Sequence, residues 1–411
     1  MSRTSQATRT RSRPLPAQFK LLWGAIALSN IGDGLRIVAL PLLATSVTDD
    51  PRLIAGVTVA ERLAWLLFIL PGGAWADRFD RRRLRMRVDT LRALVMATLV
   101  VLVLLDSVSI WIVFVVAAVL ASGEAVVDSS SMAMVPALVD GSDLERAGAR
   151  LTSTELVTND LIGPPLGGLL FGLAVAIPFG VDAVTFAGAA IVMSFMSGSF
   201  HASASASTEV ALRSQISEGF RWLWGQPLLR RLALISFGLG TSSLIGNGVF
   251  VIFARDELGL SEFGYGLLLV PGAFGGIVGS FLAPRLRRVP LRSALTGAVL
   301  ASGGATFVYA TSSSPIVVAL LAATSLGAVM VWNVLTVALR QRLIPDELLG
   351  RVGASYRFVV YAGMPIGAFL GGVIANEYGV RTSLLVSGSC LVAIGSLVPV
   401  ALRGVGEYDT R

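Results

Sequence analysis

The sequence has few side chains that support redox, metal or histidine chemistry. Its 411 residues include one cysteine, one histidine and a single lysine, Lys20. Cys390 cannot form a disulfide within the chain, and no CxxC pair is present to bind zinc or cycle between redox states. His201 lies in a short Ser/Ala stretch, which is typical of a solvated loop. Any proton transfer is therefore expected to use carboxylates.

Charged side chains are scarce as well. They make up 14% of the chain, against about 25% in an ordinary soluble protein. Hydrophobic residues account for 54%, and the mean hydropathy is +0.75. This composition excludes a disordered chain, a fibrous protein and an ordinary cytosolic enzyme. It predicts a protein that crosses a membrane many times.

Long apolar runs supply the crossings. A helix needs about 20 mostly apolar residues to span the hydrocarbon layer, and twelve such segments can be placed. Six precede a polar stretch and six follow it: 20–46, 53–76, 86–105, 109–135, 147–176, 179–197, 232–254, 264–283, 291–311, 315–339, 348–375 and 380–402. The first contains Asp33 and Arg36 and has no small-residue cleavage site, so we interpret it as a span and not as a cleaved signal peptide. The predicted fold class is an all-α membrane protein with twelve transmembrane helices.

These segments define five regions of the chain. They are a basic tail at 1–19, a six-helix bundle at 20–197, a polar linker at 198–231, a second six-helix bundle at 232–402 and a short tail at 403–411. The linker contains an amphipathic stretch, 217–224, whose aromatic residues suit a membrane interface.

Arginine is distributed unevenly over the connections between segments. The two tails and the even-numbered loops hold most of the basic residues, and we place Arg85 in one of these loops; the odd-numbered loops hold Arg52, Arg255 and Arg381. Short loops rich in Lys and Arg stay in the cytoplasm. Both termini are therefore predicted to be cytoplasmic, in the inner or plasma membrane of a bacterium. The arginines are expected to meet lipid headgroups, and no nucleic-acid partner is expected.

Weak repeats relate the two sets of six segments. Leu144–Ala149 aligns with Leu349–Ala354 about 205 positions later, and the pair Gly167-Gly168 aligns with Gly371-Gly372. Matches in the same order predict two bundles related by a pseudo-twofold axis along the membrane normal. Bundles of this kind commonly enclose a site near the midplane and rock around it.

A charged motif follows the second segment. Residues 73–84 read Gly-Ala-Trp-Ala-Asp-Arg-Phe-Asp-Arg-Arg-Arg-Leu, where the glycine would permit close helix approach and the first aspartate could pair with the arginines. The motif resembles the signature loop of the major facilitator superfamily, with Asp80 at the position of the family's second glycine. The resemblance implies that the first aspartate docks near the start of the eleventh segment, at 346–351, and closes the cytoplasmic side. The residues of this expected gating loop are Gly73, Asp77, Arg78, Arg81 and Arg82.

The fifth segment contains a proline- and glycine-rich sequence, Gly163-Pro164-Pro165-Leu166-Gly167-Gly168. Proline removes a helix hydrogen bond, and glycine allows a neighbouring helix to approach. We expect a hinge at Gly163, Pro164, Gly167 and Gly168. The sequence also resembles the core of the antiporter motif of drug-exporting members of the superfamily. Together with Gly32-Asp33-Gly34 and the linker, it resembles the branch that includes macrolide efflux proteins and siderophore exporters.

Two pairs of charged residues lie within the predicted spans. Asp33 and Arg36 are three apart, and Glu124 and Asp128 are four apart, so each pair shares one face of a helix. A charge at the midplane costs about 2.5–3.5 kcal/mol and usually faces a partner or a cavity. The pairs could bind protons or cargo, or the acids could simply neutralise Arg36 or Arg62. In the second half we expect a neutral, aromatic wall for the site, from the residues Asn247, Asn333, Tyr356, Arg357 and Tyr361.

These features predict a secondary transporter, without a cofactor, that uses the proton gradient to export amphipathic small molecules such as drugs, macrolides or siderophores. A monomer in the bilayer is expected to suffice. The alternatives are a proton-coupled importer of a small metabolite and a membrane receptor that does not transport. An enzyme is not expected, because the chain has no HExxH or GxSxG motif and no Ser/His pair.

Overall fold

The computed structural model describes residues 15–200 and 209–403, and every regular element in these ranges is a helix. The first half contains α1 Ala17–Val47, α2 Pro51–Arg78, α3 Arg81–Leu104, α4 Ile110–Leu138, η1 Gly141–Asp143, α5 Leu144–Glu155, η2 Leu156–Ile162, α6 Gly163–Leu173 and α7 Ala176–Ser194. The second half contains α9 Pro227–Asn247, α10 Phe250–Ile252, η3 Phe253–Glu257, α11 Glu262–Leu282, η4 Arg285–Arg288, α12 Leu291–Thr311, α13 Pro315–Leu343, η5 Asp346–Leu348, α14 Leu349–Tyr378 and α15 Val380–Ala401. Helix α8, Glu209–Gly225, connects the halves.

Ten helices in the described ranges are long and apolar enough to cross a membrane. The remaining two predicted segments fall on α2 and α3, which have 28 and 24 residues but carry several charges. Two crossings include short π-helical stretches, η2 before α6 and η3 after α10. The predicted all-α membrane architecture is thus confirmed, and α2 and α3 are long helices that are not among these ten.

Local sequence explains where several helices begin. The Asp50 side chain accepts a hydrogen bond from the Arg52 backbone N–H (2.9 Å), and Pro51 occupies the first turn of α2. Asp80 caps α3 in the same way by accepting from the Arg83 N–H at 2.8 Å. Asp80 therefore acts as a helix cap at the position where the superfamily usually has a glycine.

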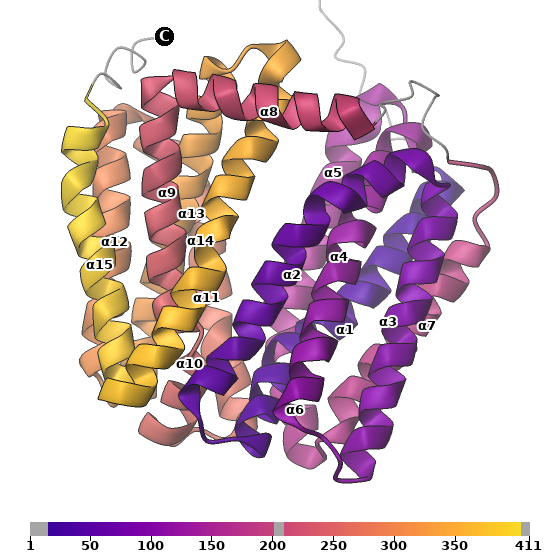
Figure 1. Ribbon diagram of the computed structural model, residues 1–411, viewed down its shortest axis with the longest axis horizontal. Coiled ribbons are helices and arrows are strands. Elements are labelled where there is room, and N and C mark those ends of the chain that lie inside the picture. Colours follow the sequence, from indigo (N-terminus) through magenta and orange to yellow (C-terminus); the bar gives the residue numbers. More distant parts are fainter. Residues whose placement is uncertain (1–14, 201–208, 404–411) are drawn as a thin grey trace, which may run out of the picture.

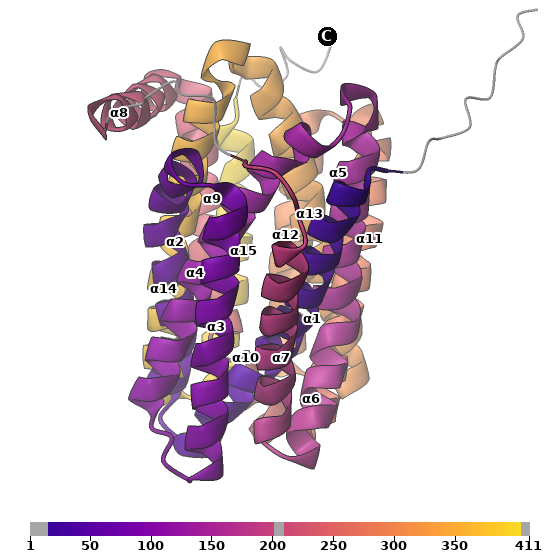
Figure 2. The same ribbon diagram turned by 90° about the vertical axis from the view of Figure 1, so that its right-hand side faces the viewer.

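The helices form two bundles that lie side by side (Figure 1). The first bundle contains α1–α7 and the second contains α9–α15, while α8 runs across one end of the second bundle, which we call the α8 end (Figures 1 and 2). Between the bundles, α2 packs against α14 and α6 packs against α11. Helix α8 packs on α14, where Glu218 forms an ion pair with Arg351 at 2.7 Å.

Glycines show that the two halves repeat each other's packing. An added Cβ at Gly167 would meet the Leu35 carbonyl oxygen of α1 at 2.5 Å, and one at Gly371 would lie 2.9 Å from the Ile245 carbonyl carbon of α9. One residue later, each glycine faces the opposite bundle. Gly168 abuts α11 and Gly372 abuts α2. The pair that aligned in sequence therefore occupies matching positions, in agreement with the predicted pseudo-twofold symmetry.

The structure changes two details of the expected loop after α2. A Cβ at Gly73 would meet no atom within 4 Å, whereas one at Gly72 would lie 3.2 Å from the Val126 Cα of α4. Close helix approach therefore depends on Gly72. Arg85 is not a loop residue, because α3 begins at Arg81 and carries the Arg85 side chain, fully buried, into the first bundle.

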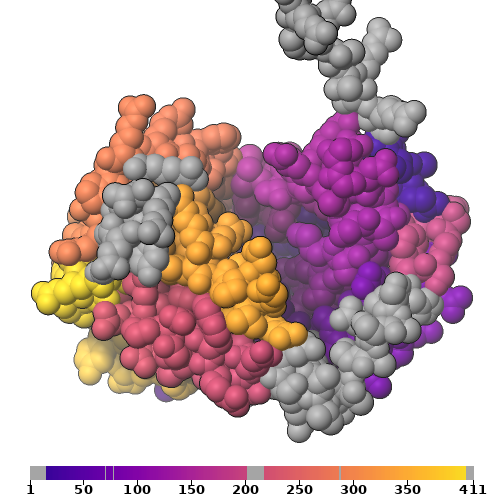
Figure 3. All heavy atoms as spheres, turned by 90° about the horizontal axis from the view of Figure 1, so that it is seen from above, coloured from indigo at the N-terminus to yellow at the C-terminus, as the bar shows by residue number. Residues whose placement is uncertain are grey.

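The bundles separate at the α8 end. Figure 3, which looks onto this end, shows a hollow between the two halves. The opposite end, which we call the far end, is closed by close contact of backbones, for example Gly266 of α11 against Pro164 of α6. In the described part of the chain, the bundles are thus apart at the α8 end and in contact at the far end.

Candidate functional site

Arg36 on α1 is the centre of a charged network inside the first bundle. Its Nη2 donates to Asp33 Oδ1 at 2.9 Å and to Glu124 Oε2 of α4 at 2.8 Å, while Nη1 donates to Glu61 Oε1 of α2 at 3.1 Å. Arg36 and Asp33 are almost fully buried, whereas the side chains of Glu61 and Glu124 are 26% and 35% exposed. Glu61 and Glu124 are therefore the members of this group that solvent can reach.

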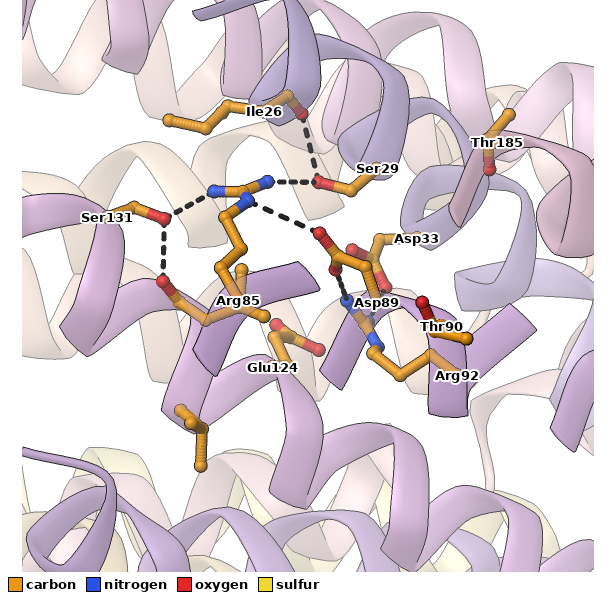
Figure 4. A network of polar contacts seen from close by, with 12 residues as sticks. Ile26, Ser29, Asp33, Arg85, Asp89, Thr90, Arg92, Glu124, Ser131 and Thr185 are labelled. Carbon is orange, nitrogen blue, oxygen red and sulfur yellow. Dashed lines mark hydrogen bonds and ion pairs between the residues drawn. The ribbon is translucent and has the colours of Figure 1, made fainter. Parts of the chain in front are cut away.

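Helix α3 adds three charged residues to the network (Figure 4). Arg92 Nη2 donates to Asp33 Oδ1 at 2.5 Å, so a single carboxylate oxygen joins two guanidinium groups. Asp89 lies 3.3 Å from Arg85 Nε, and Arg85 also donates to Ser131 of α4. All three α3 side chains are at most 1% exposed. Four helices are thus tied together by ion pairs that are buried or partly buried.

Two further carboxyls lie next to this network and have no partner cation at ion-pair distance among the described side chains. Asp128 shares a small pocket of about 70 Å³ with Asp33 and Glu124. Asp182 on α7 is fully buried, and only Thr185 hydrogen bonds to its Oδ1, at 3.5 Å. The whole group, which we call the acid network, consists of Asp33, Arg36, Glu61, Arg85, Asp89, Arg92, Glu124, Asp128 and Asp182.

The acid network contains six carboxyls and three arginines. Carboxylates in excess of their partner cations are costly in a low-dielectric interior, and neighbouring carboxylates oppose each other's ionisation. Such a group can take up protons and release them when its surroundings change. Among the described residues, no set of three or more His, Cys, Asp or Glu side chains is placed to hold a metal ion.

The second bundle encloses a much larger cavity of about 730 Å³. Asn247, Asn333 and Tyr361 all line it. Its wall also contains a hydrogen-bonded group in which Ser236 bonds to the Tyr356 hydroxyl at 2.7 Å and accepts from Trp332 Nε1 at 3.2 Å. The expected neutral wall is wrong in one respect, because Arg340 and Arg357 line the same cavity.

Tyr361 connects this cavity to the first bundle. Its ring meets Trp65 of α2 edge to face, with centroids 4.8 Å apart. Glu61 lies one helical turn before Trp65, on the same face of α2. A change in the charge of Glu61 therefore occurs one turn from a contact between the two bundles.

The expected hinge residues lie where α6 meets two other helices. A Cβ at Gly163 would come within 2.5 Å of the Gly34 Cα of α1, while Gly168 and Pro164 face α11. The π-helical stretch η2 ends immediately before Gly163, and irregular turns of this type often occur at functional positions. These residues form a junction between bundles at the far end.

Two arginines of the expected gating loop are bound to backbone carbonyls. Arg81 donates to the carbonyls of Ala76 (3.0 Å) and Ala133 (2.9 Å), and Arg82 donates to that of Ser194 (2.7 Å). Arg78 is exposed at the end of α2. The side chain of Asp77 lies outside the part of the chain that the structure describes, so its docking near the eleventh segment stays a prediction.

Sequence reasoning therefore selected residues that the structure places in two different sites. Asp33, Arg36, Glu124 and Asp128 meet in the first bundle, and Asn247, Asn333 and Tyr361 meet in the second. It missed Glu61, Arg85, Asp89, Arg92 and Asp182. The spacing of Arg85, Asp89 and Arg92 along one helical face was an available signal, as was the lone Asp182 in an apolar run.

Two helical bundles around buried charges, open on one side, define a membrane transporter. A family model described as "Transmembrane secretion effector" matches residues 12–409. The chain belongs to this family and is a major facilitator superfamily transporter of the drug-efflux branch.

Characterised relatives and solved structures agree with this assignment. The chain is 27% identical over 407 residues to the multidrug efflux pump Tap of Mycobacterium tuberculosis, covering 95% of this chain and 94% of Tap. It is 21% identical to macrolide efflux protein A of Streptococcus pyogenes, covering 96% and 98%.

A bacterial homologue of the iron transporter ferroportin shares the fold. In its inward-facing state the TM-score is 0.73 at 16% identity, covering 96% of this chain and 99% of that one. In its outward-facing state the TM-score is 0.58 at 20% identity, covering 93% and 99%.

Proposed function

We propose that this protein exports amphipathic small molecules in exchange for protons by alternating access. The observation that carries the proposal is the excess of carboxyls over guanidinium groups in the acid network, at the point where α1, α2, α3 and α4 meet. Drug, macrolide and siderophore-like molecules are the candidate cargoes, and the relatives named for multidrug and macrolide efflux favour export over import. The protein works as a monomer, with both termini cytoplasmic and the hollow at the α8 end facing the cytoplasm.

The geometry suggests how protonation of one carboxylate changes the contacts between helices. Glu124 is the most exposed partner of Arg36, and protonation would remove its negative charge and weaken that ion pair. Arg36 would then be held by Asp33 and Glu61 alone, so α4 would be less tightly tied to α1 and α2. Because α2 contacts α14 through Trp65 and Tyr361, loosening within the first bundle can alter the contact between bundles.

Amide substitutions of three acids test the proposal. Purified protein in liposomes with an imposed pH gradient and a trapped pH dye should move protons when amphipathic dyes are added from a panel of cationic, neutral and anionic members. Asp33→Asn, Glu124→Gln or Asp128→Asn should abolish this movement in at least one case, because an amide cannot carry the proton. Asp106→Asn, an exposed carboxylate in the loop after α3, is the matched control and should retain it.

Unchanged proton movement in all three variants would reject the role of these acids. In inverted vesicles the cytoplasmic face of the membrane is outside, so export should accumulate the dye in the lumen. Movement of the dye from the lumen to the outside would show import instead of export.

A further inference from the structure

The cavity of the second bundle has a chemical character that efflux alone does not explain. Arg340 of α13 and Arg357 of α14 line it, whereas no Asp or Glu of the described part of the chain does. The other polar groups of its wall are neutral amides and hydroxyls, such as Asn247 and Asn333. The cavity is therefore positively charged, in contrast to the acid network of the first bundle.

The two arginines, half-buried Arg340 and exposed Arg357, differ from the buried arginines of the first bundle. Arg36, Arg85 and Arg92 each lie within 3.3 Å of a carboxylate oxygen. The guanidinium of Arg340 instead lies over the Tyr356 ring at 3.9 Å, and its Nε donates to the Thr336 carbonyl at 3.3 Å. Among the carboxylates whose side chains the structure describes, none forms an ion pair with Arg340 or Arg357.

Guanidinium groups that line a cavity without a described carboxylate partner favour the binding of an anion there. A charge within the bilayer usually has a partner or faces a water-filled cavity, and two like charges on one cavity wall raise each other's cost. Arginine binds carboxylate, sulfonate and phosphate oxygens through paired hydrogen bonds, and such charge-assisted bonds are about twice as strong as neutral ones. The Arg340 head group is already oriented by Tyr356, which reduces the entropy lost on binding.

We propose that this cavity binds amphipathic anions, with the anionic group against Arg340 and Arg357 and the apolar body against Trp332 and Tyr361. The proposal rests on the proposed export function and names the class of its cargo. The same chemistry fits two sources, a free organic anion and the headgroup of an anionic lipid. A volume of about 730 Å³ accommodates a drug-sized molecule or a lipid headgroup with part of its chain.

A pair of dyes that differ in charge tests the proposal without any proton gradient. 8-Anilinonaphthalene-1-sulfonate carries a sulfonate, and N-phenyl-1-naphthylamine has the same aromatic skeleton without it. Binding is measured by fluorescence with purified protein in phosphatidylcholine nanodiscs, after subtraction of empty discs. Arg340→Gln and Arg357→Gln should each weaken binding of the sulfonate about tenfold and change binding of the neutral dye less than twofold. Arg340→Lys should recover part of the loss.

Arg342→Gln is the matched control. Arg342 shares the last turn of α13 with Arg340, and so the same helix dipole, but does not line the cavity. Retained binding of the neutral dye shows that each variant is folded. Equal losses in Arg342→Gln and Arg340→Gln, or wild-type protein that does not prefer the sulfonate, would overturn the proposal.

Added phosphatidylglycerol separates the two sources. Competition with the sulfonate assigns the site to lipid headgroups, and undiminished sulfonate binding assigns it to free anions. Because no gradient is applied, a failure of proton coupling would refute the proposed function and leave the dye-binding result intact. A failure of the sulfonate to bind would refute the anion site and leave proton-coupled export intact.

Discussion

A methyl group placed at Gly266 should open the far end of the transporter. Gly266 lies on α11 where it crosses α6, and an added Cβ would lie 2.8 Å from the Pro164 carbonyl carbon and 3.0 Å from the Pro165 Cα. Both atoms belong to backbone, which cannot rotate away as a flexible side chain can. The Gly266→Ala variant can therefore relieve the clash only by moving α11 away from α6, which separates the two bundles.

The size of the effect follows from the geometry. Carbon atoms pack best about 3.5–4.0 Å apart, so the helices must separate by about 1 Å. Overpacking of this kind typically costs about 1–3 kcal/mol. The strain is present when the far end is closed and absent when it is open. The equilibrium should therefore shift toward the open far end by about 5- to 150-fold.

Spin labels across the far end measure this shift. Cysteines at the exposed positions Ser107 and Thr311, in a Cys390→Ser background, place one label on each bundle, and their separation is read by double electron–electron resonance. The longer distance should gain population in Gly266→Ala. Gly276→Ala on the same helix is the control, because its Cβ would meet nothing nearer than 4.0 Å. An unchanged distance distribution in Gly266→Ala, or equal shifts in both variants, would refute the steric argument.

Two predictions concern stability, and the thermal unfolding midpoint followed by tryptophan fluorescence checks both. Asp80→Ala removes the cap of α3 and leaves the Arg83 N–H without that acceptor, so it should cost about 1 kcal/mol of stability and lower the midpoint. Asp80→Asn should retain most of that stability, because an amide oxygen can still accept the bond. Equal midpoints for both variants would argue against the cap. Arg92→Met removes a cation shared by Asp33 and Asp89 and should cost about 3–5 kcal/mol, with the double variant Arg92→Met/Asp33→Asn less destabilised. A double variant no more stable than the single one would show that the lost cation is not the cause.

Much of the architecture could be predicted because it depends on patterns along the chain. Apolar runs long enough to cross a bilayer marked the helices, and even α2 and α3, with their charges, overlap two of the twelve segments. The aligned glycine pairs predicted the internal repeat. In the structure, Gly168 and Gly372 each allow close packing against the opposite bundle. Arg85 was misplaced because a basic run after an apolar segment also suits a lipid-facing loop.

The composition of the two sites depended on tertiary structure. Helical spacing put Asp33 beside Arg36 and Glu124 near Asp128, since neighbours three or four apart share a face. That spacing does not determine which helix faces contact each other. Only packing brought Glu61 and Arg92 to the same charges from other helices, and only packing placed Arg340 over Tyr356 in a cavity without acids.

The sequence by itself thus determined that this protein lies in a membrane, is helical and is built as two similar halves, because hydropathy and repeats act locally along the chain. The tertiary structure alone decided that carboxyls gather in one half and unpaired arginines in the other, because the charge of a cavity is set by contacts between helices far apart in sequence.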